Sequence, residues 1–312
     1  MKENQSLEFK ERITNTFLKT VSAYANFGDG IIQFGITDDG KVLGVEDTES
    51  TCLDIENRIN DSISPVPDYE LSVDNETNVI TLTVKEGSFK PYYYKAKAYK
   101  RNDTATIEVD RIELNHLILE GENRSYDELT AKGNEFHFSI LEQKLKEQLG
   151  VSAINSDILR TLGLLGADGK YKNAGALLAD ENSFYGIDCA RFGDSIDIIL
   201  DREIFEHKSI LKQYDEAVAL YRKYYQYDEI EGALRKTVEL IPEKAFREAI
   251  ANALVHRTWD VNSHIRVAMF KDRLEVFSPG GLPKGITQEE YLNGQVSVLR
   301  NPIVASVFFR LN

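Results

Sequence analysis

Apolar positions near the start of the chain repeat with the period of a helix. In the segment 11–27, four apolar residues lie at four-residue spacing: Ile13, Phe17, Val21 and Ala25. This spacing predicts one packed helix, and Gly28, directly after it, is typical of a helix C-terminal cap.

Runs of β-forming residues follow this helix. Residues 31–36 predict a strand, the triplet Asp38-Asp39-Gly40 predicts a turn, and residues 42–45 predict the returning strand of a hairpin. The pattern therefore predicts a helix followed by a hairpin.

A second amphipathic helix is predicted before Pro65 and Pro67, which cannot continue it. Its apolar face consists of four residues: Cys52, Ile55, Ile59 and Ile63. Extended runs come after it at 71–73, 79–84 and 91–101. Residues 1–120 therefore predict a compact α+β domain.

The segment 121–150 is charged and lacks any β-branched run, so we place a domain boundary there. The expected domains are residues 1–121 and residues 122–312. In the second domain, residues 173–178 and 195–200 predict strands.

Two helices and a hairpin are predicted farther along the second domain. Residues 209–227 predict a long helix. Pro242 suits the first turn of a helix whose apolar face is Phe246, Ile250 and Ala253. The hairpin is expected from strands at 265–270 and 274–277.

Composition narrows the class of protein. The 312 residues are 42% hydrophobic and 28% charged, which excludes a disordered chain. The formal net charge is -14, so any nucleic-acid site must be local. Cys52 and Cys189 lie far apart without a CxxC or His-Cys cluster, which argues against a disulfide scaffold or a zinc finger. With no leader-like start and no long apolar run, we expect a cytoplasmic protein without a membrane span.

The most basic segment lies inside an acidic domain. Residues 85–101 carry a net charge of +5, whereas residues 1–120 together carry -9. The six cations are Lys85, Lys90, Lys95, Lys97, Lys100 and Arg101, and the interleaved rings are Tyr92, Tyr93, Tyr94 and Tyr99. In an extended strand Lys95, Lys97 and Tyr99 would share one face. Cations beside rings suit a nucleic-acid groove; the alternative is an exposed strand protected by lysines, with its tyrosines packed on the first helix.

Three carboxylates near the N-terminus suggest a metal site. Glu3, Glu8 and Asp38 would meet if the chain before the first helix ran beside the hairpin end that carries Asp38, and they could then hold Mg²⁺ or Mn²⁺ to activate water on a phosphodiester. The alternative is ordinary structural use of acidic residues at helix starts and turns.

The helix at 242–256 has a separate polar stripe. Glu248, Asn252 and His256 stand one turn apart, so an amide oxygen that could hold Mg²⁺ lies near a carboxylate that could orient water. A solvated polar face is the alternative. Farther on, Gly280 and Gly281 permit either close approach of a ligand to the backbone or simply a tight turn.

These motifs, in this order, resemble a family of bacterial transcriptional regulators with an AlbA-like domain of Schlafen type followed by a divergent ATPase-like module. The N-terminal resemblance rests on Leu7-Glu8-Phe9-Lys10, Ala25-Asn26-Phe27-Gly28-Asp29-Gly30, Phe34-Gly35-Ile36, Asp38-Asp39-Gly40, Gly44-Val45, Lys90-Pro91-Tyr92 and Tyr99-Lys100-Arg101. The C-terminal resemblance rests on residues 173–178, 247–257, 278–283 and Arg300-Asn301-Pro302.

The resemblance implies nucleic-acid binding by the first domain and a GHKL-type nucleotide site in the second. Glu248 and Asn252 fall on the Glu-x-x-x-Asn box of that class. The GHKL class also uses an Asp before its first glycines to contact adenine, where this chain has Ser278-Pro279. The regulator family continues past Arg-Asn-Pro with a second Gly-x-Gly element and then a winged helix. Since the sequence ends at Asn312, ATP turnover is not expected.

The fold class we expect is α+β, with an AlbA-like, Schlafen-type N-terminal domain and an α/β region that ends in a partial GHKL-like sandwich. The function expected is a transcriptional regulator that binds DNA or RNA and senses nucleotide; its partners are nucleic acid and a homo-oligomer, its cofactors ATP and Mg, and no membrane is involved. The alternatives are a metal-dependent Schlafen-like endoribonuclease that uses Glu3, Glu8 and Asp38, or a non-catalytic assembly module. The nucleic-acid contacts would be Lys10, Tyr92, Lys95, Lys97, Tyr99, Lys100 and Arg101. The nucleotide contacts would be Glu248, Asn252, His256, Gly280 and Gly281, with Asn252 as ligand to Mg.

Overall fold

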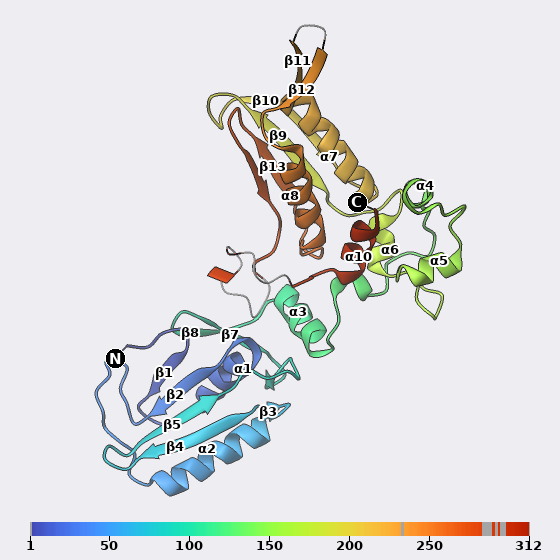
Figure 1. Ribbon diagram of the computed structural model, residues 1–312. Coiled ribbons are helices and arrows are strands. Elements are labelled where there is room, and N and C mark those ends of the chain that lie inside the picture. The colour runs from blue at the N-terminus through green and yellow to red at the C-terminus, as the bar shows by residue number, and fades with distance from the viewer. Residues whose placement is uncertain (1, 232–233, 283–288, 291–292, 294–297, 312) are drawn as a thin grey trace. The chain divides into compact units, whose positions relative to one another are not determined.

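A computed structural model describes residues 2–231, 234–282, 289–290, 293 and 298–311 (Figure 1). The chain divides into two compact units, residues 1–124 and residues 125–312. Each unit has its own hydrophobic core, and each is described by itself.

The N-terminal unit mixes short strands with three helices in its described residues. In chain order its elements are β1 (Leu7–Lys10), α1 (Phe17–Phe27), β2 (Gly30–Phe34), α2 (Thr48–Ser62), β3 (Ile63–Ser64), β4 (Tyr69–Asp74), β5 (Val79–Val84), β6 (Tyr93–Tyr94), β7 (Tyr99–Asn102), β8 (Ala105–Glu108) and α3 (Arg111–Gly121).

Four of these strands form a sheet in the order β1-β2-β5-β4 (Figure 1). β1 runs parallel to β2, and β5 is antiparallel to both β2 and β4. α1 contacts β5, α2 and the short strands β6, β7 and β8, and it buries Phe17, Val21 and Ala25. The expected apolar stripe of the first helix is therefore the face that packs in the core.

Two details of the N-terminal pattern are wrong. Residues 42–45 do not return as a strand: only Val42 makes a bridge, to Ile36, and the partner of β2 is β5. The first helix begins at Phe17 rather than at residue 11, because Thr14, Asn15 and Thr16 form turns that accept hydrogen bonds from the first helical N–H groups.

The C-terminal unit begins with small helical elements and continues into a sheet. In chain order its elements are η1 (Tyr126–Glu128), α4 (Ser139–Leu149), α5 (Ser156–Thr161), α6 (Asn173–Leu178), β9 (Ile187–Phe192), β10 (Ile199–Phe205), α7 (Ile210–Tyr225), β11 (Gln226–Glu231), β12 (Leu234–Glu239), α8 (Glu243–Val255), β13 (Ile265–Met269), β14 (Leu274–Phe277) and α10 (Pro302–Leu311).

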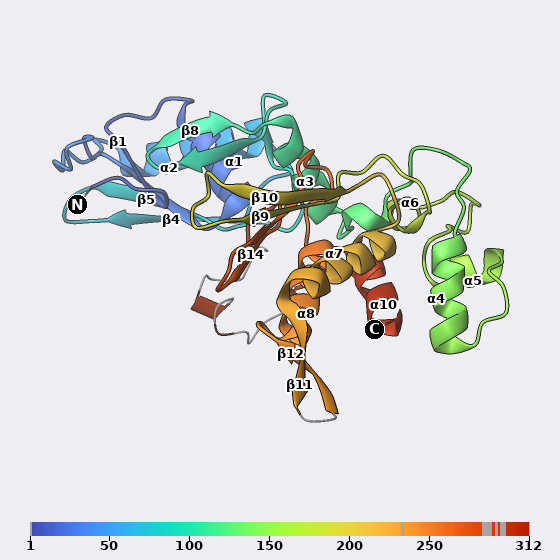
Figure 2. The ribbon, with the colours of Figure 1, turned by 90° about the horizontal axis from the view of Figure 1, so that it is seen from above.

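The main sheet of this unit has the order β10-β9-β13-β14, with β13 parallel to β9. α7 and α8 lie side by side on one face of it (Figure 2). Ile250 and Leu254 of α8 are fully buried there, so the predicted apolar face of this helix packs in the core. The mixed α+β architecture expected from the sequence is confirmed, whereas the partial GHKL-like sandwich expected for the second domain stays a prediction.

The strand expected at 173–178 is wrong. These residues form α6, and all six are buried. The small side chains Ala174, Gly175 and Ala176 let a short helix fit into a crowded core, where the Cβ of any larger residue at 175 would approach the carbonyl oxygen of Leu164. The strand expected at 195–200 begins only at Ile199.

Glu243 joins α8 to the end of α7. Its carboxylate accepts two hydrogen bonds from Arg222 (2.9 and 2.6 Å) and one from Gln226 (2.6 Å). The Arg222 hydrogen bonds, with the help of Gln226, lower the pKa of Glu243 to about 2. The carboxylate therefore stays charged in the folded chain at acidities that would protonate it in the unfolded chain.

This depressed pKa predicts a specific loss of stability in acid. The contribution of Glu243 is complete above pH 4.5, its ordinary value, and disappears as the pH falls toward 2, because only the unfolded state then takes up the proton readily. Urea titrations should show that Glu243→Gln lowers the free energy of unfolding by about 1 kcal/mol at pH 7, since water screens the half-exposed Arg222. The difference from wild type should shrink toward zero near pH 2; an unchanged difference would contradict the assignment.

Within the described part of the chain, none of the helices combines the length and the apolar character that a membrane span requires.

Candidate nucleic-acid interface

A strained turn separates β6 from β7. Tyr94 and Lys97 exchange two backbone hydrogen bonds (2.9 and 3.1 Å) around the residues Lys95 and Ala96. Both central residues have positive φ, 51° at Lys95 and 59° at Ala96. A two-residue hairpin loop of this kind favours Asn-Gly. Positive φ costs an L-residue with a Cβ about 1 kcal/mol of conformational free energy. The expected extended run 91–101 is therefore interrupted, and Lys95 is held at the tip of a turn.

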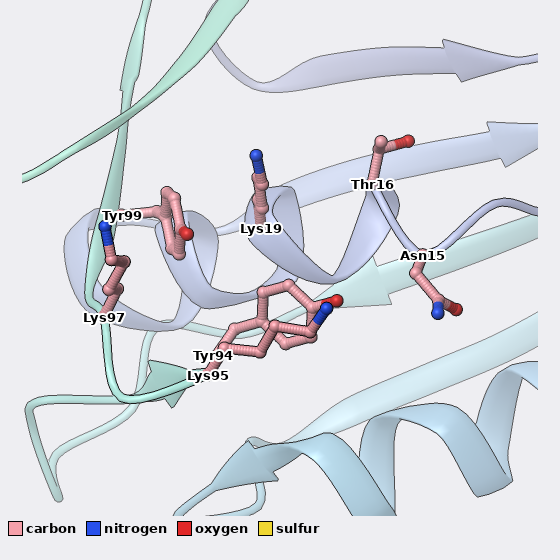
Figure 3. Close-up of a pocket in the computed structure, with 7 residues that line it drawn as sticks. All are labelled: Asn15, Thr16, Lys19, Tyr94, Lys95, Lys97 and Tyr99. Carbon is pink, nitrogen blue, oxygen red and sulfur yellow. The ribbon is translucent and has the colours of Figure 1, made fainter.

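This turn lines a cleft of about 440 Å³ beside the start of α1 (Figure 3). Three lysines reach its rim, Lys19 from α1 and Lys95 and Lys97 from the turn. The remaining lining residues are Asn15, Thr16, Tyr94 and Tyr99. The cleft thus gathers residues from two segments that are far apart in sequence.

Two of the three lysines are available for an anion. Among the described residues neither Lys19 nor Lys95 makes an ion pair; their Nζ atoms lie over the rings of Tyr99 and Tyr94, at 5.6 and 5.3 Å from the centroids. Lys97 instead pairs with Glu108 at 2.6 Å, and this hydrogen bond raises the pKa of Lys97. Lys97 is charged, but its charge is already compensated.

The other cations of the basic segment are also paired with carboxylates. Lys85 lies 3.1 Å from Asp29, and Lys100 pairs with Glu113. Lys90 is buried between Glu86 and Glu120. The basic segment is therefore not a continuous cationic surface, because most of its positive charge is neutralised within the N-terminal unit.

Arg101, expected to contact phosphate, lies in the interior. Its guanidinium forms an ion pair with Glu8 at 2.5 Å and donates hydrogen bonds to Thr106 Oγ1 (2.9 Å) and to the carbonyl of Asn4 (3.1 Å). Lys10 pairs with the same Glu8 carboxylate. The expected surface role of Arg101 is therefore corrected, whereas Lys10 remains partly exposed, with its charge compensated by Glu8.

The tyrosine rings offer little stacking surface. Tyr92 is only 3% exposed and its backbone N–H binds the Asn26 side chain, so its expected role as a stacking platform is corrected. Tyr94 and Tyr99 line the cleft but are 4% and 7% exposed. A ligand in the cleft would therefore find little open ring surface.

The carboxylates proposed for a metal site are not arranged to hold one. Glu3 accepts a hydrogen bond from the backbone N–H of Phe9 (2.8 Å), Glu8 is neutralised by Arg101 and Lys10, and Asp38 is exposed in a turn. Over the described ranges, no group of three His, Cys, Asp or Glu residues could hold a metal ion. The residues present do not fit a catalytic Mg²⁺ or Mn²⁺, because cationic side chains already satisfy Glu8.

In the C-terminal unit, the polar stripe of α8 is formed as expected. Asn252 Nδ2 donates to Glu248 Oε1 at 3.0 Å, and both side chains are exposed. His256 follows at the end of the helix, where burial and the neighbouring Arg300 lower its pKa. These residues line neither the cleft of the N-terminal unit nor a second cavity of about 260 Å³, which lies near the ends of β9 and α7 and the turn at 270–271.

Arg300 holds the paired glycines close to the end of α8. Its guanidinium donates to the carbonyls of His256 (2.9 Å) and Gly281 (2.8 Å) and to Thr258 Oγ1 (3.0 Å). Gly280 has φ 119°, and a Cβ there would lie 2.3 Å from Thr258 Oγ1, so only glycine fits. Pro283, which ends this motif, lies outside the described residues.

Among the residues that the structure describes, the groups near these glycines do not complete an adenine nucleotide site. Ser278, at the position where a carboxylate would contact adenine, donates its hydroxyl to the carbonyl of Ala253 at 2.8 Å. The side-chain amide of Asn301 donates from Nδ2 to the backbone carbonyls of Val255 (2.7 Å) and Arg257 (2.8 Å). Arg300 and Asn301 of the Arg-Asn-Pro motif therefore hold the segments around the end of α8 together.

Sequence patterns missed Lys19, Asn15 and Thr16 as site residues. Lys19 lies on the exposed face of the first helix, whereas the apolar period predicts only the buried face. Nothing in the local sequence links Lys19 to Lys95. A lysine in the first turn of the helix, outside its apolar stripe, is the one local feature that could have indicated a binding residue here.

Comparisons with known proteins assign domains to parts of the chain. Residues 3–110 match the family model described as Schlafen, AlbA_2, so the N-terminal unit carries a domain of that type. Residues 262–312 match the model described as Putative ATP-dependent DNA helicase recG C-terminal, which is an ATPase-like model. This second match begins after α8 and so does not include Glu248 or Asn252. No curated protein matches the chain.

Two solved structures are similar. The DIP2311 protein from Corynebacterium diphtheriae shares 24% identity with a TM-score of 0.52, over 98% of this chain and 67% of that one, which shows a common fold. The N-terminal domain of a Putative ATP-dependent DNA Helicase RecG-related Protein from Nitrosomonas europaea shares 19% identity with a TM-score of 0.26, over 34% of this chain and 78% of that one.

Proposed function

We propose that the N-terminal unit binds the phosphate backbone of DNA or RNA in the cleft beside α1, as part of a transcriptional regulator. The observation that carries this proposal is the turn at Lys95 and Ala96. Two residues with a Cβ occupy positions that favour Asn-Gly, and strain of this kind persists where function requires a particular side chain. Here that side chain is a lysine without a carboxylate partner in the described structure, beside the equally unpaired Lys19.

The burial of the rings limits what the cleft can recognise. Base stacking needs an open aromatic face, and Tyr94 and Tyr99 are almost fully buried. Contacts from lysine to phosphate carry no sequence information. The proposed binding is therefore sequence-independent and tolerates both single and double strands.

Charge sets the expected salt dependence. Lys19 and Lys95 would each neutralise about one phosphate, while Lys97 would first have to leave Glu108. Releasing the counterions of two phosphates gives a slope of about -2 in a plot of log affinity against log salt concentration. This shallow slope distinguishes the cleft from an extended basic groove.

The test is a fluorescence-anisotropy titration with labelled DNA and RNA oligomers at several salt concentrations. Lys95→Asn removes the cation but keeps a residue that favours the turn, and we expect it to reduce the slope by about 1. Lys19→Gln should do the same, and the double variant should bind weakly at every salt concentration.

Two control variants separate binding from folding. Ala96→Gly relaxes the turn and keeps Lys95, so it should preserve the slope while raising stability by about 0.5–1 kcal/mol. Lys85→Asn removes a lysine paired with Asp29, outside the cleft, and should leave the slope unchanged. If Lys95→Asn and Lys19→Gln bind like wild type, the cleft is not the site.

The endoribonuclease alternative receives no support from the carboxylate cluster, since Glu8 is neutralised by Arg101 and Lys10. For the C-terminal unit, nucleotide sensing rests on the match of residues 262–312 and on the Glu248–Asn252 pair. The alternative of an assembly module is compatible with the exposed hairpin of β11 and β12.

A further inference from the structure

The hairpin of β11 and β12 extends beyond the end of α7, away from the rest of the C-terminal unit (Figures 1 and 2). Within the described residues it forms a separate two-stranded sheet, and Leu234–Thr237 of β12 are all exposed. The base of the hairpin contacts α8, where the N–H of Glu243 donates to Glu239 at 2.8 Å, but an isolated two-stranded hairpin is only marginally stable in water. Leu234 and Leu240, at 76% and 57% exposure, add apolar surface to this projection.

The ladder within the hairpin fixes which backbone groups face outward. Gln226 pairs with Glu239 in register, and the N–H of Leu240 donates to the carbonyl of Tyr225 at 2.9 Å. Because hydrogen-bonded and non-bonded pairs alternate in an antiparallel ladder, the even-numbered residues of β12 bond to β11. Arg235, Thr237 and Glu239 therefore direct their N–H and C=O groups to the free edge.

We propose that this free edge of β12 pairs antiparallel with the same edge of a second copy of the chain, about a two-fold axis at Thr237. In that register Thr237 faces its own copy, and Arg235 of each chain lies opposite Glu239 of the second copy. On the other side of the sheet Leu234 lies opposite Leu240 of the second copy. By symmetry the dimer contains two Arg235–Glu239 pairs and two Leu234–Leu240 pairs. Cross-strand pairs of opposite charge and of apolar residues stabilise a sheet.

Several other symmetric registers set like charges against each other. Centring the pairing on Arg235 or Lys236 sets each of these cations against itself. The second copy could instead pair through the free edge of β11. If that pairing is centred on Asp228 or on Glu229, the carboxylate at the centre lies opposite the same carboxylate of the second copy. Like charges directly opposite each other destabilise a sheet. The charge pattern of the hairpin thus favours a second copy of this chain, joined through β12.

The ion pair that Arg235 makes within its own hairpin is compatible with this register. Its guanidinium already contacts the Asp228 carboxylate of β11. A guanidinium carries five N–H donors, so it can bind a second carboxylate without releasing the first. Arg235 would then link Asp228 of its own chain to Glu239 of the second copy.

Charge-swapped variants test this pairing directly. In sedimentation analysis of the full chain, wild type should be a dimer that dissociates on dilution. Arg235→Glu places two glutamate side chains opposite each other at both charged pairs, and Glu239→Arg places two arginine side chains there instead. Each variant alone should raise the dimer dissociation constant by about tenfold or more.

Mixing the two variants keeps the proposal falsifiable if either substitution disturbs the local fold. A one-to-one mixture of Arg235→Glu and Glu239→Arg chains restores both opposite-charge pairs, so the mixture should associate more tightly than either variant alone. Thr237→Pro removes an outward N–H, together with the hydroxyl that donates to Asp228 at 2.8 Å, but leaves the backbone hydrogen bonds between β11 and β12 in place. It should abolish the dimer while circular dichroism remains unchanged. A monomeric wild type, or single variants that dimerise as wild type does, would overturn the proposal.

Discussion

Arg101→Ala is expected to lower the free energy of unfolding of the N-terminal unit by about 3 kcal/mol, because it removes the buried one of the two cations that neutralise the Glu8 carboxylate and leaves only Lys10. The Glu8 side chain is 9% exposed, and the ion pair with Arg101 measures 2.5 Å. The substitution also removes the donors to Thr106 and to the Asn4 carbonyl. Urea unfolding followed by circular dichroism would measure the loss.

The control for Arg101 is the double variant Glu8→Gln with Arg101→Met. Removing both charges while keeping the volume should cost less than Arg101→Ala alone, since no unpaired charge remains in the interior. If instead Arg101→Ala unfolded like wild type but lost affinity for DNA and RNA, Arg101 would be a phosphate contact and not part of the core. The two outcomes separate the structural role from the binding role.

Asp127→Ala is expected to lower the free energy of unfolding of the C-terminal unit by about 3 kcal/mol. Asp127 is fully buried and caps α10, accepting hydrogen bonds from the backbone N–H groups of Ile303 (2.8 Å) and Val304 (3.0 Å). Ser125 donates to its other oxygen at 2.6 Å. Alanine would leave these donors buried without an acceptor, and thermal unfolding would report the loss.

Asp127→Asn serves as the matched control because its amide oxygen can still accept from α10. Burial raises the pKa of Asp127, although Ser125 and the two backbone N–H groups oppose this shift. The stability due to its protonated form is therefore complete below the ordinary pKa of the carboxyl and is lost as the pH rises through the raised value. Asp127→Asn should remove this pH dependence and cost less at pH 7 than Asp127→Ala; equal losses would contradict the capping role.

The candidate cleft was only partly predictable. Lys95, Lys97 and Tyr99 stand out in the sequence, and the structure does place them around one cavity. They meet there because the chain turns at Lys95 and Ala96, and not because they share a strand face. Neither residue is a typical turn former, so the local sequence gave no indication of the turn.

The failure of the basic segment as a continuous surface has an electrostatic cause. Lys85, Lys90 and Lys100 contribute to the local charge of +5, but Asp29, Glu120 and Glu113 neutralise them from other elements. Net charge within a window of sequence cannot include partners that folding brings in from elsewhere. The same reason removes Glu8 from a metal site, since Arg101 reaches it from β7.

The amino-acid sequence by itself determined the helices with a strong apolar period, such as α2, α7 and α8, and the one-turn spacing of Glu248 and Asn252. These features depend on contacts between near neighbours, whose geometry the helix repeat sets. Only the tertiary structure decided which lysines stay free, which tyrosines are buried and which strand edge is left open at β12. Those outcomes depend on pairings between residues remote in sequence, which no local pattern encodes.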